Sequence, residues 1–171
     1  MKAIFRREMS AYFSSAIAYI FLAVFNVFAG LFFSSQCLLA KTTDMSGVYA
    51  NMFMMLLFLF PILTMKLLSE EKKQKTDQCL LTSPVSLTGI VVGKYLAALV
   101  VFAISLISLV VYAIILAAFS PVNWAIMIGN IVGTFFMGVA FISVGLFVSS
   151  LTENQIIAAI GGFVLMMLLY L

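Results

Sequence analysis

Residues Glu70 to Lys94 read EEKKQKTDQCLLTSPVSLTGIVVGK and form the one sizeable polar stretch of the chain, which we call the polar segment. Long apolar runs flank it on both sides. A charged stretch between two apolar runs predicts a structured contact surface that lies outside a membrane and joins two of its spans. We therefore interpret the rest of the chain as the frame that holds this surface at the membrane.

The polar segment carries signals for two helices. Thr76 is a candidate N-cap with Asp77 in the first turn of a short helix that runs to Leu81. Ser83-Pro84 would end that helix, because the residue before a proline avoids the helical conformation. Ser86 is a candidate N-cap of a second helix, which would continue through Lys94 into the membrane.

The composition is that of an integral membrane protein. Hydrophobic residues make up 65% of the 171 residues and charged residues only 9%, whereas soluble domains carry about 25% charged residues. No charge lies between Glu8 and Lys41, between Asp44 and Lys66, or between Lys94 and Glu153. Each gap can hold at least one span of about 20 residues. We predict an all-α integral membrane protein with a single transmembrane domain over residues 1–171.

An amphipathic helix on the membrane surface is expected over residues 1–15, followed by five spans. The spans are expected over about 16–39, 49–68, 95–119, 124–149 and 155–171. Pro61 would kink the second span. Ser120-Pro121-Val122-Asn123 is the turn that divides the uncharged run 95–152, and Thr152-Glu153-Asn154 is a tight turn before the fifth span.

The orientation follows from the basic residues. Apart from Lys41, every Lys and Arg lies in the N-terminal segment, in the polar segment or at its edge. The positive-inside rule then places the N-terminus and the polar segment in the cytoplasm. The fifth span would end at Leu171 without a polar flank, so we expect the natural chain to continue through a sixth span.

Catalysis, metal binding and nucleic-acid binding are not indicated. The chain has no histidine, and Cys37 and Cys79 would lie on opposite sides of the membrane. The run Gly89-Ile-Val-Val-Gly93-Lys94-Tyr95 fails as a phosphate-binding loop, because three residues instead of four separate its glycines and Tyr95 replaces Ser or Thr. We therefore expect no cofactor, no metal and no enzymatic activity of the chain itself.

A secondary transporter is disfavoured for a different reason. Ion-coupled transporters place ionisable residues inside the membrane as relays, whereas here every charge falls at a predicted span end or in a loop. If the chain transports a substrate, the energy should come from a partner.

Glycines in the fourth span indicate a helix-packing seam. Gly129 and Gly133 form a GxxxG pattern, and Gly138 and Gly145 add small positions seven residues apart. The pattern alone leaves open whether this seam packs inside one chain or between two chains.

The polar segment resembles the membrane permeases of type-2 ABC transporters. The shared pattern is the acidic pair Glu70-Glu71, a basic pair, Thr76, the leucines Leu80-Leu81, Ser83-Pro84, and a later Gly93-Lys94. The chain is most similar to bacterial permeases grouped with gliding-motility and copper-oxidase-maturation transporters. It departs from the family at Lys75, where glycine is usual, and at Gln78, where glutamate is usual.

The resemblance implies an assembly at the bacterial plasma membrane. It implies a homodimeric or heterodimeric permease bound to two cytosolic ABC ATPase subunits, and export is the favoured direction. A coupling helix would sit in a groove of the ATPase. The implied partner-binding residues are Glu70, Glu71, Thr76, Asp77, Gln78, Leu80, Leu81, Ser83 and Pro84. The alternative is a membrane anchor or scaffold that uses the same segment to recruit a soluble partner without transport.

Overall fold

The computed structural model describes residues 2–73, 87–119 and 121–170, and helices are the regular elements in all three ranges. They are α1 (Lys2–Ser14), α2 (Ala16–Phe33), the π-helix η1 (Ser34–Leu39), α3 (Ser46–Thr64), α4 (Lys66–Lys73), α6 (Leu87–Phe119), α7 (Trp124–Leu151) and α8 (Gln155–Tyr170). The prediction of an all-α membrane fold is confirmed.

Four helical stretches in the described part of the chain are long and apolar enough to cross a membrane. They cover Ala16–Leu39, Ser46–Ser69, Thr88–Phe119 and Trp124–Leu151, close to the first four predicted spans. At the place of the fifth predicted span, α8 has 16 residues. That corresponds to about 24 Å of helix, shorter than the roughly 30 Å hydrocarbon core.

The helix α3 lies at the centre of the bundle. It packs against α2, α7 and α8, and the span Ser46–Ser69 to which it belongs is more deeply buried than the other three spans. Phe60 of α3 is fully buried and contacts Phe21, Phe102 and Phe141 from three neighbouring helices. This aromatic cluster is the middle of the core, and the outer faces of the remaining spans stay apolar and exposed.

The two predicted turns of the C-terminal half are present over the described residues 121–123 and 152–154. The helix α6 ends at Phe119, and Asn123 caps α7 by accepting hydrogen bonds from the Ala125 and Ile126 amides. Beyond α7, the Asn154 side chain accepts from the Ile156 amide at the start of α8. These are ordinary N-caps, in which a side-chain oxygen takes up a free amide.

The end of the first span differs from a continuous α-helix. Its last turns form η1, and Lys41 has φ 53°, a left-handed conformation that glycine adopts more easily. The Thr42 amide donates to the Cys37 carbonyl across this residue. This is the six-residue hydrogen bond that closes many helix C-termini.

The second span is divided into two helices, and the boundary lies four residues beyond the proline. Pro61 sits inside α3, and the Met65 amide still donates to the Pro61 carbonyl. The α-helix then ends at Thr64, and α4 begins at Lys66. Pro61 itself does not interrupt α3, and the boundary between the two helices lies at Met65, whose backbone stays right-handed helical.

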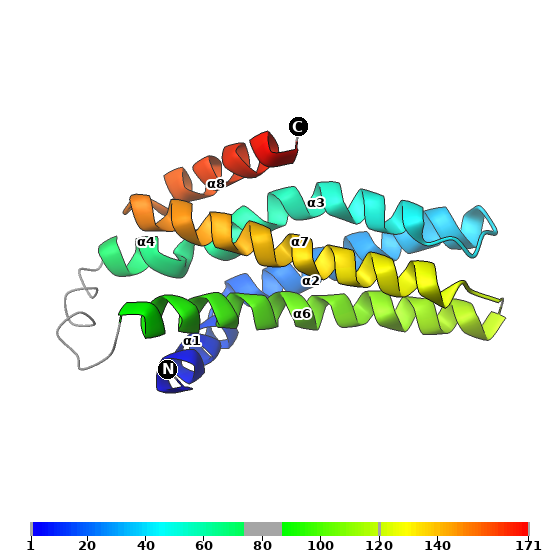
Figure 1. Ribbon diagram of the computed structural model, residues 1–171, viewed down its shortest axis with the longest axis horizontal. Helices are drawn as coiled ribbons and strands as arrows, with labels where there is room; N and C mark the ends of the chain where they lie inside the picture. Colours follow the sequence, from blue (N-terminus) through cyan, green and yellow to red (C-terminus); the bar gives the residue numbers. More distant parts are fainter. Residues whose placement is uncertain (1, 74–86, 120, 171) are drawn as a thin grey trace.

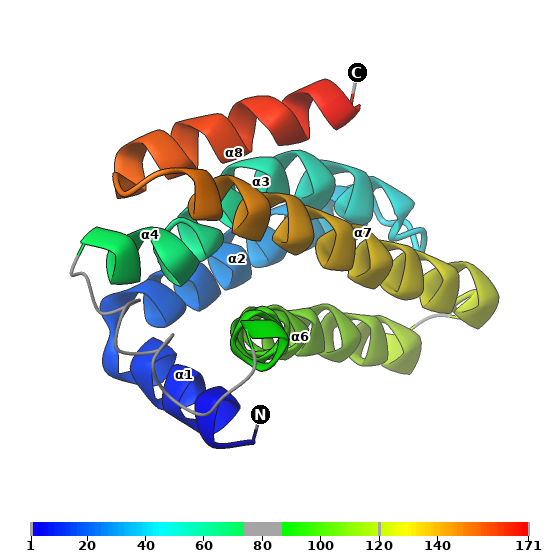
Figure 2. The same cartoon turned by 60° about the vertical axis from the view of Figure 1, so that its left-hand side comes forward.

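One end of the bundle gathers the elements that flank residues 74–86. The helix α4, the first turns of α6, the last turns of α7 and the helix α1 all lie there (Figure 1). Seen from the side, α1 runs beneath α6, while α8 lies over α3 and α7 (Figure 2). The two described flanks of the polar segment therefore pack against other helices, α4 against α7 and α6 against α1.

Candidate functional site

Most of the residues expected to bind a partner lie outside the described part of the chain. This holds for Thr76, Asp77, Gln78, Leu80, Leu81, Ser83 and Pro84, and for the predicted short helix 77–81. Glu70 and Glu71 belong to α4. The structure therefore describes the two flanks of the polar segment, which are α4 on the entry side and α6 on the exit side.

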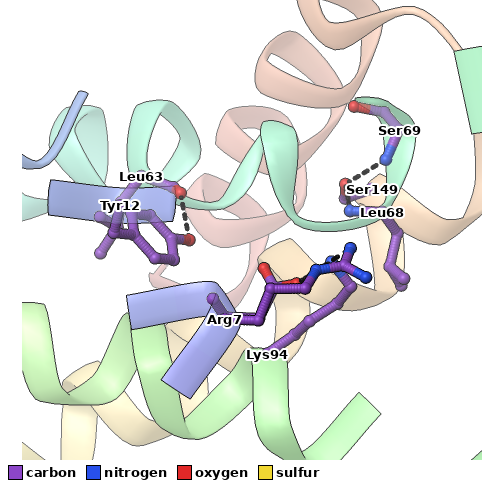
Figure 3. Close-up of polar contacts among 8 residues, drawn as sticks. Arg7, Tyr12, Leu63, Leu68, Ser69, Lys94 and Ser149 are labelled. Carbon is purple, nitrogen blue, oxygen red and sulfur yellow. Dashed lines mark hydrogen bonds and ion pairs between the residues drawn. The ribbon is translucent and has the colours of Figure 1, made fainter. Parts of the chain in front are cut away.

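On the entry side, Ser149 of α7 caps the start of α4. Its hydroxyl oxygen accepts hydrogen bonds from the Leu68 and Ser69 amides, both at 3.1 Å (Figure 3). The same hydroxyl donates to the Met65 carbonyl at 3.1 Å. The first four amides of any helix lack partners within the helix. Because Ser149 and Ser69 are fully buried, water cannot satisfy these groups, and the serine of another helix does so.

A second contact runs in the opposite direction between the same two helices. The Lys72 ammonium group of α4 donates to the Ser150 carbonyl in the last turn of α7. The last four carbonyls of a helix are free, and this end of the helix dipole attracts cations. Each helix therefore satisfies an end of the other, and we call Met65, Leu68, Ser69, Lys72, Ser149 and Ser150 the α4–α7 clasp.

On the exit side, an ion pair joins α6 to α1. The Lys94 Nζ lies 3.2 Å from the Glu8 Oε1, and the two side chains are only 3% and 10% exposed. Arg7 approaches the same oxygen at 3.7 Å from the surface, where its side chain is 56% exposed (Figure 3). A buried charge needs an opposite charge or hydrogen bonds close to it. We call Glu8 and Lys94 the α1–α6 clasp.

The helix α1 also contacts the second span near the boundary between α3 and α4. The Tyr12 hydroxyl donates to the Leu63 carbonyl of α3 at 3.1 Å, just before the boundary at Met65. Burial, with a smaller contribution from the Glu8 carboxylate, raises the pKa of Tyr12 above its ordinary value. The phenol therefore stays protonated and remains a donor to this carbonyl.

The glycines of α7 fall into two groups. A Cβ added to Gly138 would overlap the Phe102 ring of α6, and one added to Gly145 would overlap the Thr64 side chain of α3. A Cβ on Gly129 or Gly133 would meet no atom of the described residues within 4 Å. The close approaches inside this chain therefore lie at Gly138 and Gly145, and the GxxxG pair makes no such approach within the described part of the chain.

The polar groups on the two flanks hold helices together through hydrogen bonds on the entry side and an ion pair on the exit side. Within residues 2–73, 87–119 and 121–170, no three His, Cys, Asp or Glu side chains gather as metal ligands. The site consists of α4, which leads into the polar segment and is bound to α7, and α6, which leads out of it and is bound to α1.

Sequence reasoning missed the partners of both clasps. Lys94 stood out only as the last charge before a long apolar run, and Ser149 only as a small polar residue near a span end. The one available signal was the isolation of these groups, because a lysine or a hydroxyl in apolar surroundings needs a partner. The identity of that partner depends on which helices are neighbours in space.

Comparison with known protein families matches residues 62–171 to the family described as ABC-2 family transporter protein. The match begins in α3 and includes α4, the whole polar segment, α6, α7 and α8. Searches of curated proteins and of solved structures find no significant match. Since the family match covers more than half of the 171 residues, the chain belongs to the ABC-2 transporter family.

Proposed function

We propose that this chain is the permease subunit of an ATP-driven exporter and that the polar segment receives the movement of a cytosolic ATPase. The observation that carries the proposal is the ABC-2 family match over residues 62–171, since this one match contains the polar segment and the spans on both sides of it. Permeases of this family are membrane subunits, and ATP hydrolysis resides in a separate ABC ATPase.

The proposed orientation puts α1 and the polar segment in the cytoplasm of a bacterial cell. Arg6 and Arg7 of α1 are exposed, and Lys66 and Lys72 lie on the entry flank. In contrast, Lys41 is the one basic residue between the first and second spans. This distribution agrees with the positive-inside rule.

The proposed assembly contains two permease chains and two ATPase subunits. ATP closes the two ATPase subunits, and their closure shifts the polar segments that they hold. The spans then change from an inward-facing to an outward-facing arrangement. Leu80 and Leu81 are the apolar anchors of the contact with the ATPase. The other residues that supply this contact are Glu70, Glu71, Thr76, Asp77, Gln78, Ser83 and Pro84.

The double variant Leu80→Asp/Leu81→Asp tests this contact. Two leucines buried in a groove contribute roughly 1.5–3 kcal/mol each, and a carboxylate in their place would be desolvated without a partner. We expect the co-expressed ATPase to bind at least about 100-fold more weakly. The measurement is co-purification of the ATPase with the permease in detergent or nanodiscs.

The matched control places the same charges at the other end of the bundle. Thr42→Asp/Thr43→Asp changes the loop between η1 and α3 and should leave the yield of bound ATPase at the wild-type level. Wild-type yield from the Leu80/Leu81 variant would rule out this segment as the docking element. Recovery of a partner without ATPase activity would support the scaffold function instead.

A further inference from the structure

Met65 marks the boundary between α3 and α4 in the second span. A continuous helix would carry a displacement of α4 directly into α3 through its backbone hydrogen bonds. Here α3 ends at Thr64 and α4 begins at Lys66, while Met65 between them keeps a right-handed helical conformation and its amide donates to the Pro61 carbonyl. At this junction, backbone groups of the span bond to side chains of other helices, namely the Leu63 carbonyl to Tyr12 and the Leu68 amide to Ser149.

The α4–α7 clasp restricts the position of α4 relative to α7. A serine hydroxyl has one hydrogen to donate and two lone pairs to accept. Ser149 uses all three, since it accepts from Leu68 and Ser69 and donates to Met65. Hydrogen bonds prefer near-linear geometry and weaken steeply below about 120°, so three bonds to one hydroxyl restrict the relative position of the two helices.

Lys72 adds a second point of attachment. Its bond to the Ser150 carbonyl lies toward the C-terminal end of α4, whereas the Ser149 contacts lie at its start. Two separate points prevent α4 from rotating about a single contact. Leu67, which is 2% exposed, also buries its side chain beside this junction.

We propose that α4 and the last turn of α7 move as one rigid body, so that a displacement of the polar segment passes to α7 and α8. In this proposal Ser149 and Lys72 are positioning residues for the coupling movement. The proposal rests on the proposed function, because the displacement comes from the ATPase.

Close contacts of α7 with α3 and α6 would pass a movement of α7 on to the core of the bundle. At Gly145, α7 approaches Thr64 beside the boundary at Met65, and at Gly138 it approaches Phe102 of α6. Beyond Leu151, only residues 152–154 separate α7 from α8. A tilt of α7 would therefore repack α3 and α6 at these two glycines and carry the start of α8 with it.

Hydrogen exchange of the full-length permease in nanodiscs tests the clasp without any partner. In Ser149→Ala the Leu68 and Ser69 amides lose their acceptor, and we expect the α4 amides to exchange about tenfold faster. Ser150→Ala is the matched control, because the Ser150 hydroxyl donates to the Phe147 carbonyl of its own helix and the substitution keeps the Ser150 carbonyl. Lys72→Met should give a smaller acceleration.

Spin labels test the transmission in the complex with the ATPase. Cysteines replace the exposed Leu151 on α7 and the exposed Ser10 on α1, and the distance is measured by double electron–electron resonance with and without ATP and vanadate. We expect the nucleotide to shift the distance in the wild type and in Ser150→Ala. In Ser149→Ala the shift should fall to less than about half, although ATPase remains bound.

The outcomes separate the two proposals. Wild-type exchange of α4 in Ser149→Ala, or a full nucleotide-driven shift in that variant, would overturn the rigid body. A bound ATPase whose nucleotide leaves the wild-type distance unchanged would overturn the transmission through α7. Absence of any bound ATPase would overturn the proposed function, and the exchange experiment would still decide whether α4 and α7 are joined.

Discussion

The two flanks of the polar segment are fixed by different chemistry. On the entry side, the α4–α7 clasp joins a hydroxyl group and a lysine to backbone groups at helix ends. On the exit side, the α1–α6 clasp is a buried ion pair between Glu8 and Lys94. Hydrogen bonds to the backbone depend strongly on angle, whereas the attraction between two charges falls only gradually with distance. The entry flank is therefore more restricted in position, and the exit flank can shift slightly while its pair survives.

Because the two flanks are held by different interactions, their disruption should lower the free energy of unfolding by different amounts. The largest loss is expected at the Glu8–Lys94 ion pair. Glu8→Gln removes the carboxylate from a 3%-exposed ammonium group, and loss of one partner of a buried pair typically costs about 3–5 kcal/mol. We expect a loss of about 3 kcal/mol in the free energy of unfolding. Denaturant titration of the purified permease measures it.

Two further variants identify the cause of that loss. Glu8→Lys combined with Lys94→Glu reverses the pair and should recover part of the stability. Glu153→Gln removes an exposed carboxylate between α7 and α8 and should change stability by less than about 0.5 kcal/mol. A Glu8→Gln variant no less stable than Ser149→Ala would reverse the ranking of the two clasps.

An intermediate loss in the free energy of unfolding is expected when a methyl group is added to α7 where it packs against Thr64 of α3. Gly145→Ala places its Cβ against the Thr64 side chain, and overpacking of this kind costs roughly 1–3 kcal/mol. Gly133→Ala adds the same methyl group to the same helix where no atom of the described residues lies within 4 Å. Because alanine favours a helix over glycine by up to about 1 kcal/mol, that control should be neutral or stabilising.

The pair of glycine variants also tests the geometry of the entry flank. If Gly145→Ala moves α7 away from Thr64, the Ser149 hydroxyl should move away from the α4 amides as well. We expect the α4 amides to exchange faster in Gly145→Ala than in the wild type. In Gly133→Ala their exchange rate should stay at the wild-type value. Equal exchange in both variants would mean that the clasp does not depend on this close approach.

The smallest effect is expected at the contact between α1 and α3. Tyr12→Phe keeps the ring and removes the hydroxyl that donates to the Leu63 carbonyl. A single buried hydrogen bond contributes about 1 kcal/mol net, so the loss should be about that size and well below the loss from Glu8→Gln. If Tyr12→Phe lost more stability than Glu8→Gln, the main contact of α1 would be with α3 at Leu63 rather than with α6 at Lys94.

The spans and turns could be predicted because their signals are local. Runs without charge mark the four long helical stretches, and Pro121 and Asn123 mark the turn after α6. The site could be predicted only as a segment. The boundary at Met65 was not predictable from Pro61, since α3 remains helical through the proline and backbone groups at the boundary bond to Tyr12 and Ser149 from other helices.

The glycines show the same limit of local patterns. The GxxxG pair at Gly129 and Gly133 has the more familiar spacing, yet the close approaches inside the chain occur at Gly138 and Gly145. A glycine is needed where a neighbouring helix crosses closely, and the crossing point is set by bulky residues such as Phe102 on the other helix. Spacing along one helix contains no information about that partner.

The Glu8–Lys94 pair has a consequence for the order in which the protein is made. Lys94 follows Glu8 by 86 residues in the sequence, and ribosomes add roughly 5–20 residues per second. The carboxylate is thus synthesised about 4–17 s before the ammonium group that it contacts in the folded chain. Tyr12 likewise precedes Leu63 by 51 residues. The contacts of α1 with α3 and α6 can therefore form only after those later helices have been synthesised.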